Sequence, residues 1–365
     1  MLSILAPLFH LETTQALMVM TPLLKIAVVI PCYRVRRHIL KVLAQIGSEV
    51  SRIYVIDDAC PEQSGDFVKA HCYDPRVKII KNSHNLGVGG TVMKGYQAAL
   101  EAGDIDIIVK IDGDGQMDPR LIPSFILPIL SGQADYTKGN RFFDLEKLKG
   151  MPKIRLFGNA VLSFMAKLST GYWNLFDPTN GYTAIHINIV RLLPLEKISN
   201  RYFFETDLLF RLNILRASVI DIPMVAQYND EKSNLKIAKI FSNFLSSHIK
   251  NFFKRIFYNY YLRDMSLASI ELPLGLCLVL FGLIFGMDQW HQSITSHLTV
   301  SAGTVMLSAL PLIIGLQLIL SFLGQDIRMV PTKSIYPLMG LLDHSLEKNL
   351  EINTQENPVQ EKCSQ

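Results

Sequence analysis

Residues Asp106–Pro119 read DIIVKIDGDGQMDP, a short apolar run that ends in two carboxylates one residue apart. A run of this length, bounded by turn residues, is typical of a strand buried on both faces. Asp112 and Asp114 therefore stand at the end of a predicted strand, where both can face one cation. Hard oxygen ligands suit Mg²⁺ or Mn²⁺, which keep waters and bridge to substrate phosphates. Gly113 and Gly115 let the backbone turn there and let a bulky ligand approach.

Short apolar runs alternate with amphipathic runs on both sides of this strand, from Lys25 to about Leu130. The predicted strands are Lys25–Ile30, Arg52–Ile56, Val77–Ile80 and Asp106–Ile111, and the predicted helices are Arg36–Ile46, Glu62–His71 and Val88–Ala102. Alternation of this kind predicts an α/β fold, a Rossmann-like and mainly parallel sheet with flanking helices. Such sheets bind ligands at the carboxyl ends of their strands, which is where the acidic motif falls.

A second acidic pair, Asp57 and Asp58, follows the predicted strand Arg52–Ile56. These carboxylates can accept hydrogen bonds from a nucleobase or from ribose hydroxyls, or they can form a turn or a helix cap, and the pair alone does not decide between these roles. The glycine-rich segment NLGVGG (Asn85–Gly90) precedes a predicted helix but lacks the Lys-Ser/Thr of a P-loop. We therefore expect a close approach of loop and helix at this segment, with ligand contact secondary.

The composition indicates apolar segments beyond an ordinary core. Of the 365 residues 49% are hydrophobic, and the mean hydropathy is positive. The formal net charge of +4 is too small to indicate a nucleic-acid partner. The five cysteines show no CxxC spacing, which fits a reducing compartment better than a disulfide framework. Residues 1–24 carry no basic segment and no clear cleavage site, so we interpret them as a leader that need not be ordered, and not as a signal peptide.

The composition changes sharply at Lys232–Arg263, which contains seven Lys or Arg, no Asp or Glu, and many aromatic side chains. A basic, aromatic, helix-compatible stretch suits the surface of an anionic membrane. An ordinary basic surface helix is the alternative. We expect residues 231–265 to be a basic amphipathic juxtamembrane segment that follows the α/β domain, which we place at residues 25–230.

Two uncharged apolar runs come next, Leu272–Met287 with Ser266–Ile270 before it, and Leu298–Gly324. At ~1.5 Å rise per residue each can cross a ~30 Å hydrocarbon core, so residues 266–325 are predicted to form a two-helix transmembrane hairpin. The alternative is a buried helical hairpin of a soluble domain. The spacing of Gly282 and Gly286 allows helices to pair, so a homo-oligomer is compatible with the sequence.

The charges around the hairpin predict its orientation. The loop at about Asp288–His297 contains no Lys or Arg, whereas both outer flanks do. The flanking basic residues are Lys254, Arg255, Arg263, Arg328 and Lys333. The positive-inside rule then places the α/β domain and the tail, residues 326–365, in the cytoplasm.

Seven segments carry a family resemblance, which runs from Ala27 to about Leu235. They are VVIPCYR (Val28–Arg34), VIDDAC (Val55–Cys60), NLGVGG (Asn85–Gly90), DGDGQMDP (Asp112–Pro119), GNRF (Gly139–Phe142), DPTNGY (Asp177–Tyr182) and FFETD (Phe203–Asp207). In this order they resemble the family 2 glycosyltransferases of the GT-A fold. The sub-pattern is similar to dolichol-phosphate mannose synthases and to bacterial polyprenyl-phosphate glycosyltransferases. A chance match of all seven in family order is very improbable.

The resemblance implies an inverting, metal-dependent transfer of a sugar from a nucleotide sugar, UDP- or GDP-linked, to a polyprenyl phosphate. It implies an integral membrane protein, of a bacterial inner or plasma membrane, with its catalytic domain in the cytoplasm. The implied donor-binding residues are Pro31, Tyr33, Asp57, Asp58, Asp112 and Gly113. The implied ligands of Mg²⁺ or Mn²⁺ are Asp112 and Asp114.

The resemblance also implies catalytic groups. Arg141 and Arg155 match basic positions near the phosphates, and a guanidinium suits phosphate through its bidentate fork. Asp177 and Asp207, with Glu205 beside the latter, match positions that supply a base or contact the acceptor. For the arginines the alternative is a surface salt bridge, and for the carboxylates a helix cap or structural hydrogen bond.

The nature of the acceptor decides whether a base is needed. A phosphate acceptor is already an anion at neutral pH, whereas the hydroxyl of a lipid-linked sugar needs deprotonation. The hydroxyl-directed, non-processive transferase is therefore the runner-up prediction. The chain also departs from the synthase pattern before its membrane segment, because Tyr228 and Asn234 stand where an Arg and a Lys are typical, with Lys232 as a substitute.

Rival functions fit less well. A processive polysaccharide synthase usually carries a QxxRW-type element, and neither Trp173 nor Trp290 follows an arginine. Two spans also do not enclose a polymer path. A non-catalytic scaffold would be expected to have lost its metal carboxylates, and Asp112 and Asp114 are both present.

Overall fold

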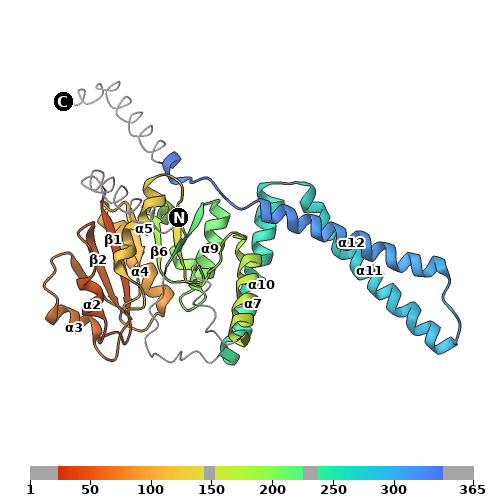
Figure 1. Cartoon of the computed structure of the whole chain (residues 1–365), viewed down its shortest axis with the longest axis horizontal. Helices are drawn as coiled ribbons and strands as arrows, with labels where there is room; N and C mark the ends of the chain where they lie inside the picture. Colours follow the sequence, from red (N-terminus) through yellow and green to blue (C-terminus); the bar gives the residue numbers. More distant parts are fainter. Residues whose placement is uncertain (1–23, 144–152, 225–236, 340–365) are drawn as a thin grey trace, which may run out of the picture.

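The computed structural model describes residues 24–143, 153–224 and 237–339, without the side chains of residues 153–157, 159 and 237–241. A seven-stranded sheet of order β3-β2-β1-β4-β6-β5-β7 forms its centre (Figure 1). The strands are β1 (Ile26–Cys32), β2 (Val50–Asp57), β3 (Val77–Lys81), β4 (Ile107–Lys110), β5 (Tyr136–Asn140), β6 (Thr183–His186) and β7 (Val219–Pro223). Strand β6 runs antiparallel to both neighbours, and the other pairs are parallel. The predicted mainly parallel α/β sheet is confirmed.

Helices cover both faces of the sheet, because successive strand residues point to opposite faces and both sides of the central strands are apolar. On one face α2 (Ile39–Ala44), α3 (Ser64–His71) and α5 (Ile122–Leu130) pack in a cluster with Val28 and Val109. On the other face α4 (Val88–Ala102), α8 (Ile187–Leu192) and α9 (Phe204–Leu215) pack with Val29 and Ile108. Short 3₁₀ turns at Pro119–Leu121 and Leu195–Lys197 precede α5 and α9.

The elements differ from the predicted ones at the start of α2 and in the number of strands. Helix Val88–Ala102 has the predicted bounds, but α2 begins at Ile39, not Arg36, because the Val35 carbonyl accepts the N–H groups of residues 38 and 39 in a preceding turn. The sequence analysis assigns no strand after Ser131. Strands β5, β6 and β7 complete the sheet beyond β4, and they bring the GNRF and DPTNGY segments beside the acidic turn after β4.

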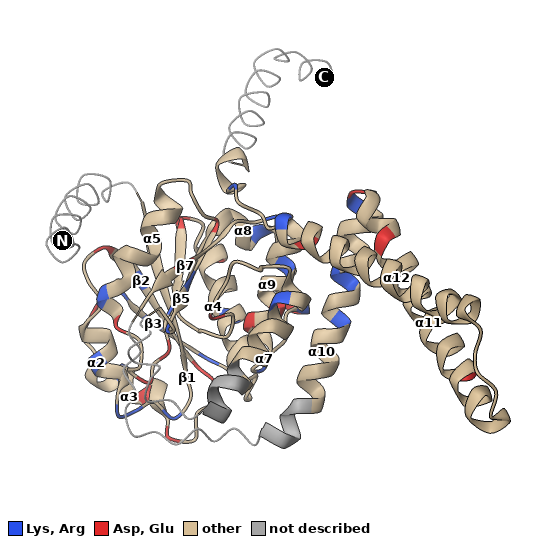
Figure 2. Cartoon of the chain, turned by 45° about the vertical axis from the view of Figure 1, so that its right-hand side comes forward, with Lys and Arg blue, Asp and Glu red and all other residues tan. Residues whose placement is uncertain are grey.

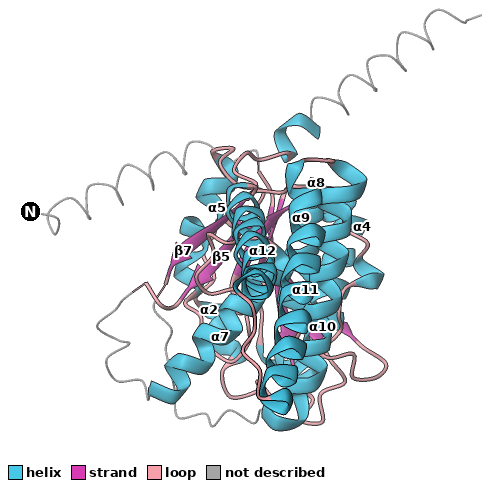
Figure 3. Ribbon diagram, turned by 90° about the vertical axis from the view of Figure 1, so that its right-hand side faces the viewer, coloured by secondary structure: helices cyan, strands magenta, loops and turns pink. Residues whose placement is uncertain are grey.

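A helical layer joins the sheet domain to a long hairpin. Helices α7 (Lys153–Thr170) and α10 (Ile237–Phe257) lie against α9 (Figure 3). A π-helical turn (Tyr258–Arg263) then leads into α11 (Leu267–Ser296) and α12 (Ala302–Arg328), which project away from the sheet (Figure 1). Tyr228–Leu235, the leader up to residue 23 and the tail beyond residue 339 lie outside the described residues.

The hairpin has the composition of membrane-crossing helices. Both helices contain an 18-residue window of mean hydropathy 2.2, and only 22% of that window in α11 and 11% in α12 is buried within the molecule. A buried hairpin of a soluble domain would be mostly covered, so the low burial disfavours that alternative. Figure 2 shows charged residues gathered at the base of the hairpin and almost none along it.

The turn of the hairpin is shorter than predicted. Helix α11 continues through the segment Asp288–His297, which the sequence analysis assigned to a loop, and residues 297–301 alone make the turn. The difference has a local cause, because residues 288–296 contain neither Gly nor Pro, the two residues that destabilise a helix most. The helix ends at His297, whose φ of 53° is left-handed.

Buried polar contacts fix the base of the hairpin to the sheet domain. Arg255 of α10 pairs with Asp326 of α12 at 2.6 Å, and both side chains are 2% exposed. Asp326 also accepts hydrogen bonds from Trp173 Nε1 and Tyr260 Oη, each at 2.8 Å. Beyond the hairpin, the backbone N–H of Tyr336 donates to Asp135 at 2.8 Å. Both ends of the hairpin are therefore held by the same domain.

Candidate functional site

The acidic turn lies where β4 ends, at the edge of the sheet. Asp114 Oδ1 accepts the N–H of Gln116 at 3.0 Å, and Gly115 has a φ of 78°, so this turn favours glycine there. Gly113 packs against Val35 and Ile39, and a Cβ on it would meet each at 3.2 Å. The glycines thus shape the turn and hold it tightly to α2, which leaves the two carboxylates at the surface of the edge.

Lys110 is paired with the first of these carboxylates. Its Nζ lies 2.6 Å from Asp112 Oδ1, with the lysine side chain 2% exposed and the aspartate side chain 29% exposed. The same ammonium lies 5.5 Å from the centre of the Phe204 ring. Lys110 therefore points from β4 toward the α9 face of the sheet, and not into solvent.

Two buried lysines flank one threonine of the central antiparallel strand. Thr183 of β6 is in register with Lys110 on one side and with Lys138 on the other. Paired residues of antiparallel strands point to the same face, so all three face α9. Lys138 donates a hydrogen bond to the carbonyl of Asn180, and burial lowers the pKa of this lysine. The side chains of Lys110, Thr183 and Lys138 form a row across the three strands, and this row places two ammonium groups below the surface of the site.

Glu205, in the first turn of α9, supplies a negative charge opposite this row. Burial raises the pKa of its carboxyl, and the positive charges of Lys110 and Lys138 oppose that rise. The negative charge of Asp112 adds to the rise, so Glu205 lies within electrostatic reach of the acidic turn. Of the three carboxylates predicted as base, this one is grouped with the acidic turn and the buried lysines.

Asp207 faces the opposite way. Its Oδ2 accepts the N–H of Ser199 at 3.0 Å and contacts Arg211, while its Oδ1 accepts from Asn251 of α10 at 3.0 Å. Residues two apart on a helix are separated by about 200°, so Glu205 and Asp207 cannot face the same site. The contacts of Asp207 are those of a structural link between α9 and α10.

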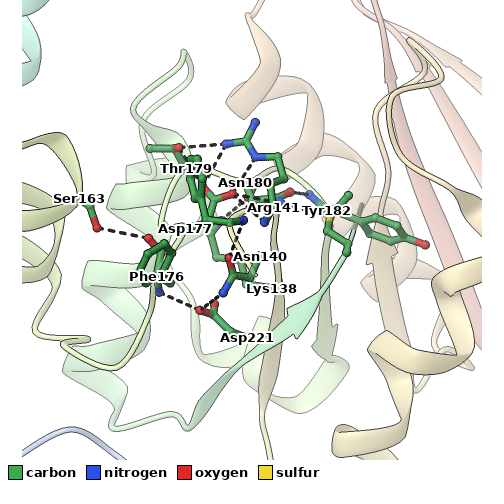
Figure 4. A network of polar contacts seen from close by, with 12 residues as sticks. Lys138, Asn140, Arg141, Ser163, Phe176, Asp177, Thr179, Asn180, Tyr182 and Asp221 are labelled. Carbon is green, nitrogen blue, oxygen red and sulfur yellow. Dashed lines mark hydrogen bonds and ion pairs between the residues drawn. The ribbon is translucent and has the colours of Figure 1, made fainter. Parts of the chain in front are cut away.

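Asp177 and Arg141 form a bidentate pair (Figure 4). Arg141 Nε and one Nη donate to the two carboxylate oxygens at 2.7 and 3.0 Å, and the Asp177 side chain is 1% exposed. Asn180 of the same loop is tied to Lys138, so the DPTNG loop is held from two sides. The arrangement fixes Arg141, 29% exposed, at the edge where β5 ends.

The pair Asp57–Asp58 organises loops. Asp57 accepts the N–H groups of Cys60 at 2.8 Å and Gly65 at 2.6 Å. Asp58 accepts those of Leu86 at 2.7 Å and Gly87 at 2.9 Å. Each carboxylate therefore holds a neighbouring loop in place, and the nucleotide contacts implied for them stay predictions.

The NLGVGG segment shows the expected close approach. A Cβ on Gly89 would lie 2.2 Å from the carbonyl oxygen of Ser199, and one on Gly87 2.7 Å from that of Asn200. The start of α4 therefore packs directly on the loop before α9.

The remaining predicted residues are placed as follows. Pro31 is half-buried in β1 between the buried residues Ile30 and Cys32, and Tyr33, beyond the strand, is 43% exposed. Both lie at the same edge of the sheet as Asp57, because Cys32 and Asp57 are in register. Arg155 belongs to α7, but its side chain lies outside the described part of the structure.

The donor set of the acidic turn fits a hard divalent cation in part. Asp112 and Asp114 offer carboxylate oxygens, the ligand type that Mg²⁺ and Mn²⁺ prefer. Among the described residues no group of three or more His, Cys, Asp or Glu is close enough to hold a metal by itself. Water and a ligand diphosphate would have to supply the other ligands, as is usual for Mg²⁺.

The sequence analysis missed Lys110 and Lys138. A signal was present, because a lysine in the apolar run DIIVKI interrupts a strand predicted to be buried on both faces. Lysine is almost never fully buried unless it is paired, so such a position predicts a buried counter-charge. Lys138 carried no signal, because β5 itself was not predicted.

These side chains gather at the carboxyl ends of the sheet strands, which is where α/β sheets bind ligands. The model of glycosyl transferase family 2 matches residues 27–193. Residues 27–193 therefore carry a family 2 glycosyltransferase domain.

Curated relatives agree with this assignment. A UDP-N-acetylglucosamine–dolichyl-phosphate N-acetylglucosaminyltransferase from Methanococcus voltae is 26% identical over 219 residues, which cover 56% of this chain and 86% of that protein. A dolichol-phosphate mannosyltransferase from Pyrococcus furiosus is 24% identical over 187 residues, covering 50% of this chain and 52% of that protein. Among solved structures, glucosyl-3-phosphoglycerate synthase from M. tuberculosis is similar with a TM-score of 0.48 and 16% identity, covering 62% of this chain and 80% of that chain.

Proposed function

We propose that this protein transfers a sugar from a UDP- or GDP-sugar to a polyprenyl phosphate at the cytoplasmic face of a membrane, with inversion at the anomeric carbon. The observation that carries the proposal is the similarity to two transferases whose names give a dolichyl phosphate as acceptor. The exposed apolar hairpin supports it, because a transferase of this class needs access to a lipid.

The donor is proposed to lie across the carboxyl ends of β1, β2 and β4, near Pro31, Tyr33 and the acidic turn. Asp112 and Asp114 would hold a divalent cation, which supplies positive charge to the leaving nucleoside diphosphate. Asp57 and Asp58 hold the loops that border this region. Their proposed contribution is therefore to shape the nucleotide site as much as to contact the base or ribose.

The acceptor is proposed to arrive from the membrane along α10. Exposed apolar side chains recur every four residues and form a stripe along this helix and the π-helical turn that follows it. They are Leu245, Ile249, Phe253 and Phe257 of α10 and Tyr261 of the turn. The exposed residues Lys250 and Lys254 lie on the same helix. An apolar stripe bordered by lysines suits the headgroup region of an anionic membrane, so α10 would lie on the leaflet surface.

Arg141 is the proposed contact for the acceptor phosphate. Asp177 holds the guanidinium in a fixed orientation through two hydrogen bonds. A pre-oriented guanidinium loses little side-chain entropy when it binds phosphate. Arg155 of α7 is proposed as a second phosphate contact on the basis of the family resemblance.

One observation favours the second candidate function, transfer to a hydroxyl of a lipid-linked sugar. Glu205 has a raised pKa, as a general base often has, and it belongs to the charge group around Asp112. A phosphate acceptor would leave this base with no proton to remove. In that case Glu205 serves only to neutralise the lysines below the site.

The deciding experiment is lipid labelling. Membranes that contain the protein would be supplied with radiolabelled UDP- and GDP-sugars, polyprenyl phosphate, and Mg²⁺ or EDTA, and then extracted with organic solvent. Metal-dependent label in an acid-labile lipid is expected. Label that appears only when a lipid-linked sugar is added would contradict the phosphate acceptor and favour the hydroxyl. An Asp114→Ala variant, which should insert normally but form no labelled lipid, is the matched control.

A further inference from the structure

The feature that goes beyond this assignment is the enclosure of the Lys110 ammonium. It is held between the carboxylate of Asp112, the ring of Phe204 and the backbone of Gly181. A Cβ on Gly181 would come within 3 Å of both Asp112 Oδ2, at 2.9 Å, and the lysine Nζ. The DPTNG loop thus closes over the ion pair, and glycine at this position leaves room for it.

This ion pair cannot be an ordinary surface salt bridge. An ammonium that is 98% covered must keep a counter-charge, because an unpaired buried charge is costly. Asp112 is that counter-charge at 2.6 Å, whereas Glu205 acts at longer range. The contact at Asp112 Oδ1 is an ion pair without hydrogen-bond geometry, so Lys110 acts on this carboxylate through its charge.

We propose that Lys110 is a positioning residue that makes divalent metal binding at Asp112 and Asp114 depend on the donor diphosphate. This inference rests on the proposed metal site. The positive charge of Lys110 offsets the charge of one of the two carboxylates and so weakens their attraction for a divalent cation held mostly by water. The diphosphate brings the further negative oxygens, so metal and nucleotide bind together and the free enzyme holds little metal.

The test measures Mn²⁺ affinity of the full-length, detergent-solubilised protein by the electron paramagnetic resonance signal of free Mn²⁺, with and without UDP or GDP. The wild-type protein is expected to bind Mn²⁺ at least about tenfold more tightly with the nucleoside diphosphate. Lys110→Met is expected to bind Mn²⁺ without nucleotide at least about tenfold more tightly than the wild type, because a nearby positive charge is gone. Lys110→Arg keeps the charge and should resemble the wild type.

Lys94→Met, an exposed lysine of α4, is the matched control and should change nothing. An unchanged Mn²⁺ affinity in folded Lys110→Met would overturn the inference and leave the proposed function intact. Should that variant fail to fold, Lys110→Gln is measured instead, with the same expected gain. No Mn²⁺ binding by the wild type with either nucleotide would overturn the proposed metal site itself, and the inference with it.

Discussion

The buried pair between Arg255 and Asp326 is the strongest link between the catalytic domain and the hairpin, and Asp326→Asn removes its charge with little change of shape. Asp326 accepts from two guanidinium nitrogens at 2.6 and 2.9 Å. It also accepts from Tyr260 and Trp173, each at 2.8 Å. The amide keeps acceptor capacity on one atom only, so the guanidinium would remain buried without a charged partner.

The expected magnitude follows from these contacts. Removing one partner of a buried ion pair costs about 3–5 kcal/mol, because the other charge stays buried. Arg255 keeps its bond to the carbonyl of Leu168 at 2.8 Å, so the lower end of that range applies. A loss of about 3 kcal/mol corresponds to a fall in Tm of roughly 6–12 °C for a domain of this size.

The assay is thermal unfolding of the full-length protein in detergent micelles, followed by near-ultraviolet circular dichroism. The control is Asp288→Asn, at an exposed carboxylate near the far end of α11, which should stay within about 0.5 kcal/mol of the wild type. The double variant Arg255→Met/Asp326→Leu leaves no unpaired charge and should be more stable than Asp326→Asn. A Tm of Asp326→Asn within about 2 °C of the wild type would refute the reasoning.

Four further predictions concern the site and the elements around it. Glu205→Gln should lower kcat less than about tenfold in the lipid-labelling assay, since a phosphate needs no base, and a loss above about 10² would instead favour a hydroxyl acceptor. Asp207→Asn should lower the free energy of unfolding by about 1–3 kcal/mol, while the activity per folded molecule is kept. Burial raises the pKa of the Asp221 carboxyl to about 6, above its value in the unfolded chain, so the stability of the fold decreases as the pH rises toward 6. The free energy of unfolding of Asp221→Asn should therefore exceed that of the wild type by up to about 3 kcal/mol at pH 8 and should equal it at pH 4, as measured by Tm over a pH series. Gly181→Ala should abolish labelled lipid, because its Cβ would lie 2.9 Å from Asp112 Oδ2, and full activity would contradict the enclosure of the ion pair.

The first half of the sheet could be predicted because its strands are short apolar runs, and β1, β2 and β4 are largely buried on both faces. Strands β5 and β6 could not, because Tyr136–Asn140 and Thr183–His186 contain polar residues whose partners come from distant segments. The extent of α11 was also hidden, because Asp288 and Gln289 look like loop residues although nothing in them stops a helix. The sequence pattern therefore predicts helices and strands whose formation depends on neighbouring residues, and it misses strands that form by pairing with distant segments.

The same distinction applies to the site. Asp112 and Asp114 can be recognised from the sequence because their spacing and their position after a strand are local features. The roles of Asp57 and Asp58 depend on which backbone N–H groups approach from other loops, and sequence does not show that. The choice between Glu205 and Asp207 depends on helix α9, which the sequence analysis did not assign, because residues two apart on a helix point to different sides.

Helix α9 contacts both the proposed transfer site and helix α10, which leads to the hairpin. One side of its first turn places Glu205 near the buried lysines and Asp112, and the other side places Asp207 against Asn251 of α10. Helix α10 is in turn fixed to the base of the hairpin through Arg255 and Asp326. A protein whose acceptor lies in a membrane must hold its site at a set depth relative to the lipid headgroups. We expect the buried polar contacts from the hairpin to α10, and from α10 to α9, to hold the site at a set distance from the hairpin. This explains why charged residues, costly to bury, are placed at each of these junctions.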